Sequence, residues 1–139
     1  MSTNVINSER FVGKPSAVLF DLDNTLYSYE PAHKAGTQAV RAKVLSKISI
    51  EAAEFDSAFL KARAEIKSQL GETASSHSRL LYSQRALEHL GMRSQALLSL
   101  ELEQAYWGSF LAASEPREGV YDFLDLLARF VACAVKHFI

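Results

Sequence analysis

Two carboxylates two positions apart, Asp21 and Asp23, follow a short apolar run and are followed by a hydroxyl at Thr25. A carboxylate can act as a nucleophile and form an acyl-phosphate, which divides one difficult displacement into two easier ones. A second carboxyl nearby can protonate the leaving oxygen and later take a proton from the attacking water. This spacing therefore predicts phosphoryl-transfer chemistry, with Asp21 as the nucleophile and Asp23 as the general acid and base.

The same two carboxylates predict a metal site. Two like charges this close repel each other, so the pair needs a compensating cation. Mg²⁺ prefers carboxylate and backbone oxygens as ligands, and it would also neutralise the phosphate of a substrate. We expect Mg²⁺ as the cofactor, bound by Asp21 and Asp23, and a small phosphorylated molecule as the substrate.

The apolar run at residues 17–20 would position this chemistry. Four consecutive apolar residues suit a strand buried on both faces, and open α/β sheets bind their ligands at the carboxyl ends of such strands. A second apolar run of strand length occupies residues 130–135. We expect the two runs to pair as parallel strands of one sheet.

Between the carboxylates and residue 116 the sequence has the periodicity of helices. Apolar residues recur at intervals of three and four, as they do on the buried face of an amphipathic helix. Four such segments predict a small helical bundle, and a further amphipathic helix follows near residues 120–127. The residues that mark the four segments are Val40, Val44 and Ile48; Phe55, Phe59, Ala62, Ile66 and Leu70; Leu80, Leu87 and Leu90; and Leu98, Leu102, Tyr106 and Phe110.

Residues 20–27, Phe-Asp-Leu-Asp-Asn-Thr-Leu-Tyr, resemble the first motif of the haloacid dehalogenase-like (HAD) superfamily in the form that its phosphohydrolases use. The resemblance implies that Asp21 is the nucleophile and Asp23 the general acid and base. It also implies that Mg²⁺ binds the Asp21 carboxylate and the Asp23 backbone carbonyl, and that Thr25 hydrogen-bonds in the loop. Dehalogenases of the superfamily lack the second Asp, so Asp23 favours a phosphate ester as the substrate.

A helical bundle directly after this motif resembles the helical cap of HAD phosphatases, which closes over the catalytic strand ends and selects the substrate. The implied fold class is α/β: an incomplete Rossmann-like core, with its first strands only, and an inserted α-helical cap, mostly helical overall. A mobile cap can exclude bulk water during the covalent step. The expected limits are a polar tail at 1–14, a partial core at 15–30 and 117–139, and a cap at 31–116, with hinges at 27–30 and 115–117.

The resemblance also implies catalytic groups that are missing from this chain. HAD phosphatases carry a Ser or Thr after the second core strand, a later Lys and an acidic pair for Mg²⁺, whereas residues 136–139 read Lys-His-Phe-Ile. We expect a truncation or a changed reading frame near Phe130, and doubtful activity for the 139-residue chain alone. The alternative function is a catalytically inactive fragment or an interaction module whose unpaired sheet edge binds a partner.

Three other interpretations of the acidic motif are weaker. A calcium-binding EF-hand loop that began at Asp21 would need Gly at its sixth position and Glu at its twelfth, where this chain has Leu26 and Ala32. Nucleotide-sugar transferases also use Asp-x-Asp as a metal site, but without the apolar strand before it and Asn-Thr-Leu after it. A solvated turn with two chance acids is the remaining alternative.

Residues 75–79, Ser-Ser-His-Ser-Arg, lie between two predicted helices. A loop there could present Arg79 and His77 to a substrate anion. Because loops expose polar residues by default, we favour a solvated loop and keep Arg79 as a weak candidate for substrate binding. His33 and His89 have no second His or Cys at ligand spacing, which argues against a transition-metal site.

Composition excludes several other classes of protein. The chain has 48% hydrophobic residues, enough for a packed core, and a formal net charge of -1, which indicates neither nucleic acid nor an anionic membrane as a partner. No apolar stretch is long enough to span a bilayer. A single cysteine, Cys133, excludes an internal disulfide and favours the reducing cytoplasm.

Overall fold

The computed structural model describes residues 16–129 and the backbone of residues 132–135. Within these residues the chain forms two compact units. The strand unit contains residues 16–27 and 116–135, apart from 130 and 131, and the helical unit contains residues 28–115. The limits expected from the sequence lie within a few residues of this division. That the two units act as core and cap stays a prediction.

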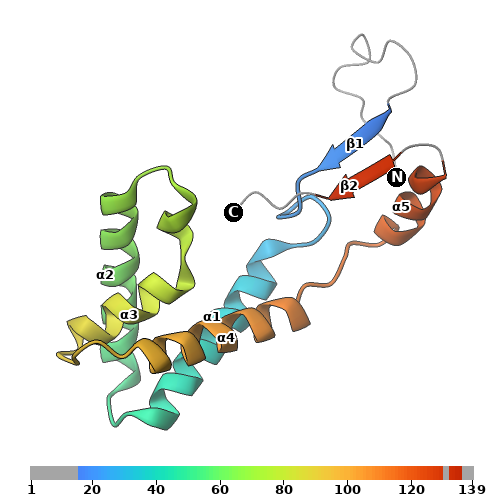
Figure 1. The fold of residues 1–139 in the computed structure, drawn as a ribbon. Coiled ribbons are helices and arrows are strands. Elements are labelled where there is room, and N and C mark those ends of the chain that lie inside the picture. The colour runs from blue at the N-terminus through green and yellow to red at the C-terminus, as the bar shows by residue number, and fades with distance from the viewer. Residues whose placement is uncertain (1–15, 130–131, 136–139) are drawn as a thin grey trace. The chain divides into compact units, whose positions relative to one another are not determined.

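The strand unit is built on two parallel strands, β1 (Ala17–Phe20) and β2 (Ala132–Val135), which Figure 1 shows side by side. The register pairs Ala17 with Ala132 and Phe20 with Val135. Parallel strands need a crossover connection, and α5 (Val120–Ala128) is the helix that leads into β2. The predicted pairing of the two apolar runs is confirmed; residues 130 and 131 of the second run lie outside the described residues.

The prediction that β1 is buried on both faces is wrong. Alternate residues of a strand face opposite sides of the sheet. Phe20 is half-buried and its ring meets the edge of Phe123 on α5, at 6.0 Å between centroids. Leu19, by contrast, keeps 59% of its surface exposed, because no other described element of this unit packs against its side of the strand.

The helical unit is a bundle of four helices, as the apolar periodicity predicted. α1 packs along α4, α2 along α3, and α3 also against α4 (Figure 1). The buried faces carry most of the predicted apolar residues, including Val44, Ile66, Leu102 and Phe110. The helices are α1 (Tyr29–Lys47), α2 (Ala52–Leu70), α3 (Arg79–His89) and α4 (Ala96–Ala112), with a short 3₁₀ helix, η2 (Ala74–His77), before α3.

The end of α3 shows why a glycine is needed there. Gly91 has φ of +77°, the left-handed conformation that glycine adopts without steric cost. Its N–H donates to the Glu88 carbonyl at 3.0 Å, and the Met92 N–H donates to the Leu87 carbonyl at 3.1 Å. This pair of bonds is a Schellman motif, which satisfies carbonyls that the helix end leaves unpaired.

The segment before α3 differs from the solvated loop that we favoured. Residues 74–77 form η2, Ser76 is buried, and the Ser78 hydroxyl caps α3 by accepting the Leu81 N–H at 3.3 Å. Arg79 is half-buried. Polar side chains enter the interior here because backbone and tyrosine oxygens lie within their reach, which sequence periodicity does not reveal.

No helix within residues 16–129 is long and apolar enough to cross a membrane.

Candidate active site

The two carboxylates lie in the loop that leaves the carboxyl end of β1. The Leu22 carbonyl accepts hydrogen bonds from the Thr25 N–H at 3.2 Å and from the Leu26 N–H at 3.0 Å, which closes a tight turn. Asn24 adopts a positive φ of 58° inside this turn, a conformation that Asn tolerates better than most residues. The turn brings the side chains at positions 21 and 25 together.

Asp21 is exposed directly after the last residue of β1. The Thr25 hydroxyl donates a hydrogen bond to Oδ2 of Asp21 at 3.1 Å. Thr25 therefore does hydrogen-bond within the loop and orients the Asp21 carboxylate. An exposed, oriented carboxylate at a strand end is accessible to a ligand.

Asp23 has a different environment. It is half-buried, and the Tyr27 hydroxyl donates a hydrogen bond to its Oδ1. Tyr27 was not among the predicted site residues. Tyr27 follows Asp23 by four residues in an irregular loop. Spacing in such a loop does not predict the direction in which a ring points.

The two connections between the units lie side by side. Tyr27 pairs with Pro116 in an antiparallel bridge, and the Arg117 N–H donates to the Leu26 carbonyl at 2.9 Å. Both predicted hinge segments therefore meet at one hydrogen-bonded point of the strand unit. Their action as hinges stays a prediction.

Arg79, the weak candidate, belongs to the helical unit and is the first residue of α3. Its guanidinium donates from Nη2 to the Tyr29 hydroxyl at 3.1 Å and to the Tyr106 hydroxyl at 3.3 Å. It donates from Nη1 to the His77 carbonyl at 3.0 Å and lies over the Tyr106 ring. Arg79 thus has a structural role inside the bundle, and its substrate role stays a proposal.

The loop offers oxygen atoms of the type that Mg²⁺ prefers as ligands, but fewer of them than the ion takes. The Asp21 carboxylate is exposed at the strand end, and the Asp23 backbone carbonyl belongs to the same turn. Among the described residues, no group of three His, Cys, Asp or Glu side chains could hold a metal ion. Mg²⁺ takes six ligands and commonly keeps several waters, so the site fits it as one part of a coordination shell.

No family model matches the chain. Its sequence is similar to a ribulose-1,5-bisphosphate 5-phosphatase of Halopiger xanaduensis, with 43% identity over 99 residues, covering 69% of this chain and 41% of that protein. The structure is similar to that of YfnB of Bacillus subtilis, described as a HAD-hydrolase bound to magnesium, with a TM-score of 0.55 and 13% identity. That match covers 90% of this chain and 53% of YfnB.

Both comparisons find hydrolases: the relative in sequence is named a phosphatase, and the solved structure is described as a HAD-hydrolase. The structural likeness shows the fold: helices inserted after the first strand of an α/β core, of which the described residues form two parallel strands. The chain spans about two fifths of the curated relative and about half of the solved structure.

Proposed function

We propose that this chain, which belongs to the haloacid dehalogenase-like superfamily, supplies the nucleophile loop and the cap of a phosphatase for a small phosphorylated metabolite. The observation that carries the proposal is the loop after β1, where an oriented Asp21 and a half-buried Asp23 follow a parallel strand. The magnesium-bound solved structure and the curated phosphatase relative support the same class of reaction.

In the first step, an Asp21 oxygen attacks the phosphorus of the substrate. A new phosphorus–oxygen bond forms to Asp21 while the bond to the leaving alkoxide breaks, and a protonated Asp23 gives its proton to that alkoxide. The products of this step are the free alcohol and an aspartyl-phosphate at Asp21. Thr25 assists by holding Oδ2 of Asp21 in place.

In the second step, Asp23 acts as the base. Its carboxylate takes a proton from a water molecule, which attacks phosphorus as the bond to Asp21 breaks. Inorganic phosphate leaves, and both carboxylates return to their starting forms. The Tyr27 hydroxyl keeps Asp23 directed into the loop through both steps.

Mg²⁺ fits this loop as a ligand of the Asp21 carboxylate and the Asp23 backbone carbonyl, where it would offset the negative charge of the carboxylates and the phosphate. The remaining ligands would come from a longer form of the chain that includes the rest of the hydrolase fold. We propose the cytoplasm as the location, because the single cysteine of the chain argues against a disulfide-rich compartment.

The substrate class follows from the curated relative. That relative is named for a sugar bisphosphate, and its 43% identity to this chain makes phosphorylated sugars the first substrates to test. The helical unit would select among them as a cap, because cap side chains meet the part of the substrate that is not the reacting phosphate.

The test is Mg²⁺-dependent release of phosphate by the longer form. We expect turnover of ribulose 1,5-bisphosphate or a related sugar phosphate, its loss on chelation of Mg²⁺, and its loss in Asp21→Asn, which removes the nucleophile without changing the side chain's size. Glu72→Gln, which replaces an exposed carboxylate of the helical unit that lines neither the groove nor the cavity described below, is the control variant and should keep full turnover. Undiminished hydrolysis by Asp21→Asn would disprove the proposal.

A second candidate function rests on the exposed apolar surface of the strand unit. Tyr121, Phe123 and Leu126 on α5 and Leu19 on β1 each keep at least half of their surface exposed. Exposed apolar groups of this kind mark a surface that another segment covers. An interaction module would bind that segment without turnover.

The two functions can be separated by mixing the 139-residue chain with a separately produced second half of the hydrolase fold. Recovery of Mg²⁺-dependent turnover in the mixture supports the phosphatase, because the missing groups then come from the added half. Formation of a stable complex that remains inactive supports the interaction module.

A further inference from the structure

The helical unit encloses a cavity of about 120 Å³ to which all four helices contribute. Most of its lining surface is apolar, but five residues with polar groups border it: His33 and Thr37 from α1, Arg63 from α2, Arg79 from α3 and Tyr106 from α4. This volume exceeds what a few ordered waters need, so a small ligand group can enter.

The charge inside this cavity is not balanced. Arg79 is half-buried and forms no ion pair with a carboxylate among the described residues. Its Nε–H is buried and finds no acceptor among them either. A guanidinium carries five N–H donors, and a buried donor without an acceptor is costly. The cavity therefore presents an unmatched cation with donors to spare.

The neighbouring groups add to this positive character. Arg63 lines the same cavity and, like Arg79, acts electrostatically on His33. Burial first, and then these two cations, lower the pKa of His33, so that its imidazole is neutral at neutral pH. Among the described residues, the acidic group that acts on His33 is Glu30, which is exposed, does not line the cavity and has the smallest influence.

The other side chains that line the cavity either take part in hydrogen bonds or are apolar. The Tyr106 hydroxyl shares a hydrogen bond of 2.8 Å with Nδ1 of His33, and burial raises the pKa of Tyr106 to about 12, so it stays protonated. Phe59 and Leu60 supply an apolar side. Two guanidinium groups, a hydroxyl and an imidazole around one space are a set of groups that recognises an oxyanion.

We propose that this cavity binds the phosphate group of a small molecule, with Arg63 and Arg79 as its charged contacts. The proposal is independent of catalysis at Asp21, which belongs to the other unit. The ligand chemistry is a tetrahedral oxyanion, supplied either as free phosphate or as a phosphate ester.

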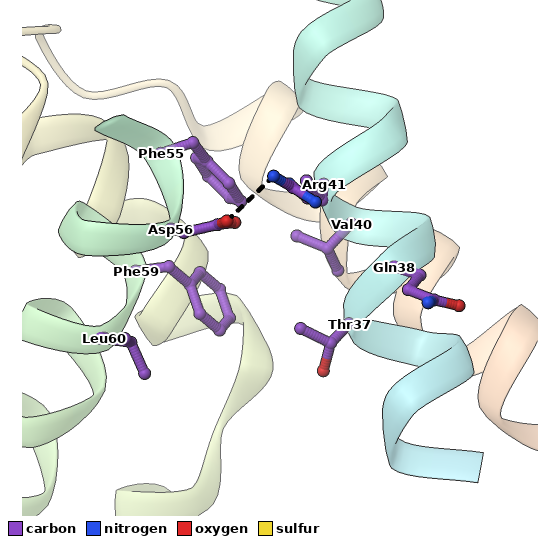
Figure 2. Close-up of a pocket in the computed structure, with 8 residues that line it drawn as sticks. All are labelled: Thr37, Gln38, Val40, Arg41, Phe55, Asp56, Phe59 and Leu60. Atoms are coloured by element: carbon purple, nitrogen blue, oxygen red, sulfur yellow. Dashed lines mark ion pairs between the residues drawn. The ribbon is translucent and has the colours of Figure 1, made fainter. Parts of the chain in front are cut away.

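A ligand can reach the cavity through a groove between α1 and α2. Figure 2 shows the side chains that line this groove, with the Arg41–Asp56 ion pair of 3.2 Å crossing it. Thr37, Phe59 and Leu60 line both the groove and the cavity, so the two spaces adjoin each other. Since Thr37 and Leu60 are exposed, the entrance opens to solvent.

The test uses the full 139-residue chain without added Mg²⁺, because the carboxylates of Asp21 and Asp23 then repel phosphate from the proposed nucleophile loop. Trp107, the one tryptophan of the chain, has its ring centroid 5.0 Å from that of Tyr106 and reports on the cavity wall by fluorescence. Titration with inorganic phosphate, at constant ionic strength set by chloride, should change this fluorescence saturably. The imidazole NMR signals of His33 should move over the same concentration range.

Substitutions of single arginines test whether phosphate binds in this cavity. Arg63→Met should weaken phosphate binding about tenfold or more, as the loss of a charge-assisted contact predicts. Arg93→Met is the matched control, because Arg93 is an exposed arginine outside the cavity, and it should bind as before. Arg63 is exposed on α2, so its replacement should leave the helical content unchanged, which circular dichroism checks.

A second arm replaces inorganic phosphate with ribose 5-phosphate. Tighter binding of the ester indicates a metabolite's phosphate group, and tighter binding of the free anion indicates inorganic phosphate; both support the proposal. Absence of saturable binding of either ligand would overturn it. Equal loss of binding in Arg63→Met and Arg93→Met would also overturn it, because the effect would then be one of net charge.

Discussion

At the scale of single residues, Gly36 on α1 lies directly against Tyr106 on α4. A Cβ at Gly36 would lie 2.8 Å from two ring carbons of Tyr106 and 3.1 Å from its backbone oxygen. The Tyr106 ring cannot move aside easily, because His33 and Arg79 hold its hydroxyl. We expect Gly36→Ala to lower the free energy of unfolding by about 1–3 kcal/mol, the usual cost of overpacking. Urea denaturation followed by circular dichroism measures it.

Gly108 supplies the matched control on α4. Nothing lies within 4 Å of the Cβ that an alanine would add there. Since alanine is a better helix former than glycine, Gly108→Ala should raise stability by about 0.5–1 kcal/mol. Equal effects of Gly36→Ala and Gly108→Ala on the free energy of unfolding would show that α1 and α4 do not pack closely at Gly36.

Residue-level chemistry was only partly predictable from the sequence. The sequence sufficed to predict that Thr25 hydrogen-bonds within the loop, because a tight turn after the strand brings positions 21 and 25 together. The chemical roles of Asp21 and Asp23 stay predictions. The contacts of Arg79 were not predictable. Its partners Tyr29 and Tyr106 lie 50 and 27 residues away, on other helices.

At the scale of elements, a polar network joins α2 to α3. Arg85 donates to both oxygens of Glu65, at 2.6 and 3.1 Å, and His89 contacts Glu65 at 2.9 Å. Glu88 accepts a further bond from Arg85 at 2.9 Å. Arg85 therefore ties the two helices together through paired hydrogen bonds to the carboxylate of Glu65.

This network predicts how stability depends on pH. The hydrogen bonds from Arg85, and then from His89, lower the pKa of Glu65 from 4.5 to about 2. A lowered carboxyl pKa stabilises the fold above the unfolded value, and this contribution disappears as the pH falls from 4.5 towards about 2. We expect the free energy of unfolding, measured in urea across this range, to fall less steeply in Glu65→Gln than in the wild type.

Glu103→Gln on α4 is the control for that measurement, because Glu103 forms no ion pair among the described residues. Its acid profile should match that of the wild type. If Glu65→Gln and Glu103→Gln behave alike, the network between α2 and α3 does not set the acid sensitivity of the chain.

Elements were more predictable than residues. Apolar spacing located all four helices of the bundle, since burial of one helix face forces a period near 3.6. It failed for β1, where the composition of residues 17–20 suits burial although only one side of the strand is covered. The composition of a strand indicates the environment that suits it. It does not determine how many elements of this chain pack against that strand.

At the scale of the whole molecule, the chain should bind Mg²⁺ weakly. Asp21 and a backbone carbonyl provide a fraction of the ligands that the ion takes, and Mg²⁺ gives up its waters reluctantly. Isothermal titration calorimetry should show no tight, stoichiometric site in the 139-residue chain. A tight site that Asp21→Asn abolishes would show that this chain alone completes the coordination shell.

The chain alone should also lack useful turnover. Developing charge on the phosphoryl oxygens must be met by positioned donors and cations, and loss of one such contact typically costs about a hundred- to a thousandfold in rate. No described group of side chains supplies a complete metal site. Phosphate release from an aryl phosphate should therefore stay at the level of a buffer control, and Mg²⁺-dependent turnover above that level would contradict the account.

The central claim is that Asp21 becomes covalently phosphorylated. The most direct test is to mix the longer, active form with substrate and Mg²⁺, stop the reaction early, reduce the aspartyl-phosphate with borohydride and map the peptide of residues 16–29 by mass spectrometry. Reduction converts a phosphorylated aspartate to homoserine. The account predicts homoserine at position 21 and unchanged Asp23. Homoserine at position 23, or turnover with no reduced residue in this peptide, would contradict it.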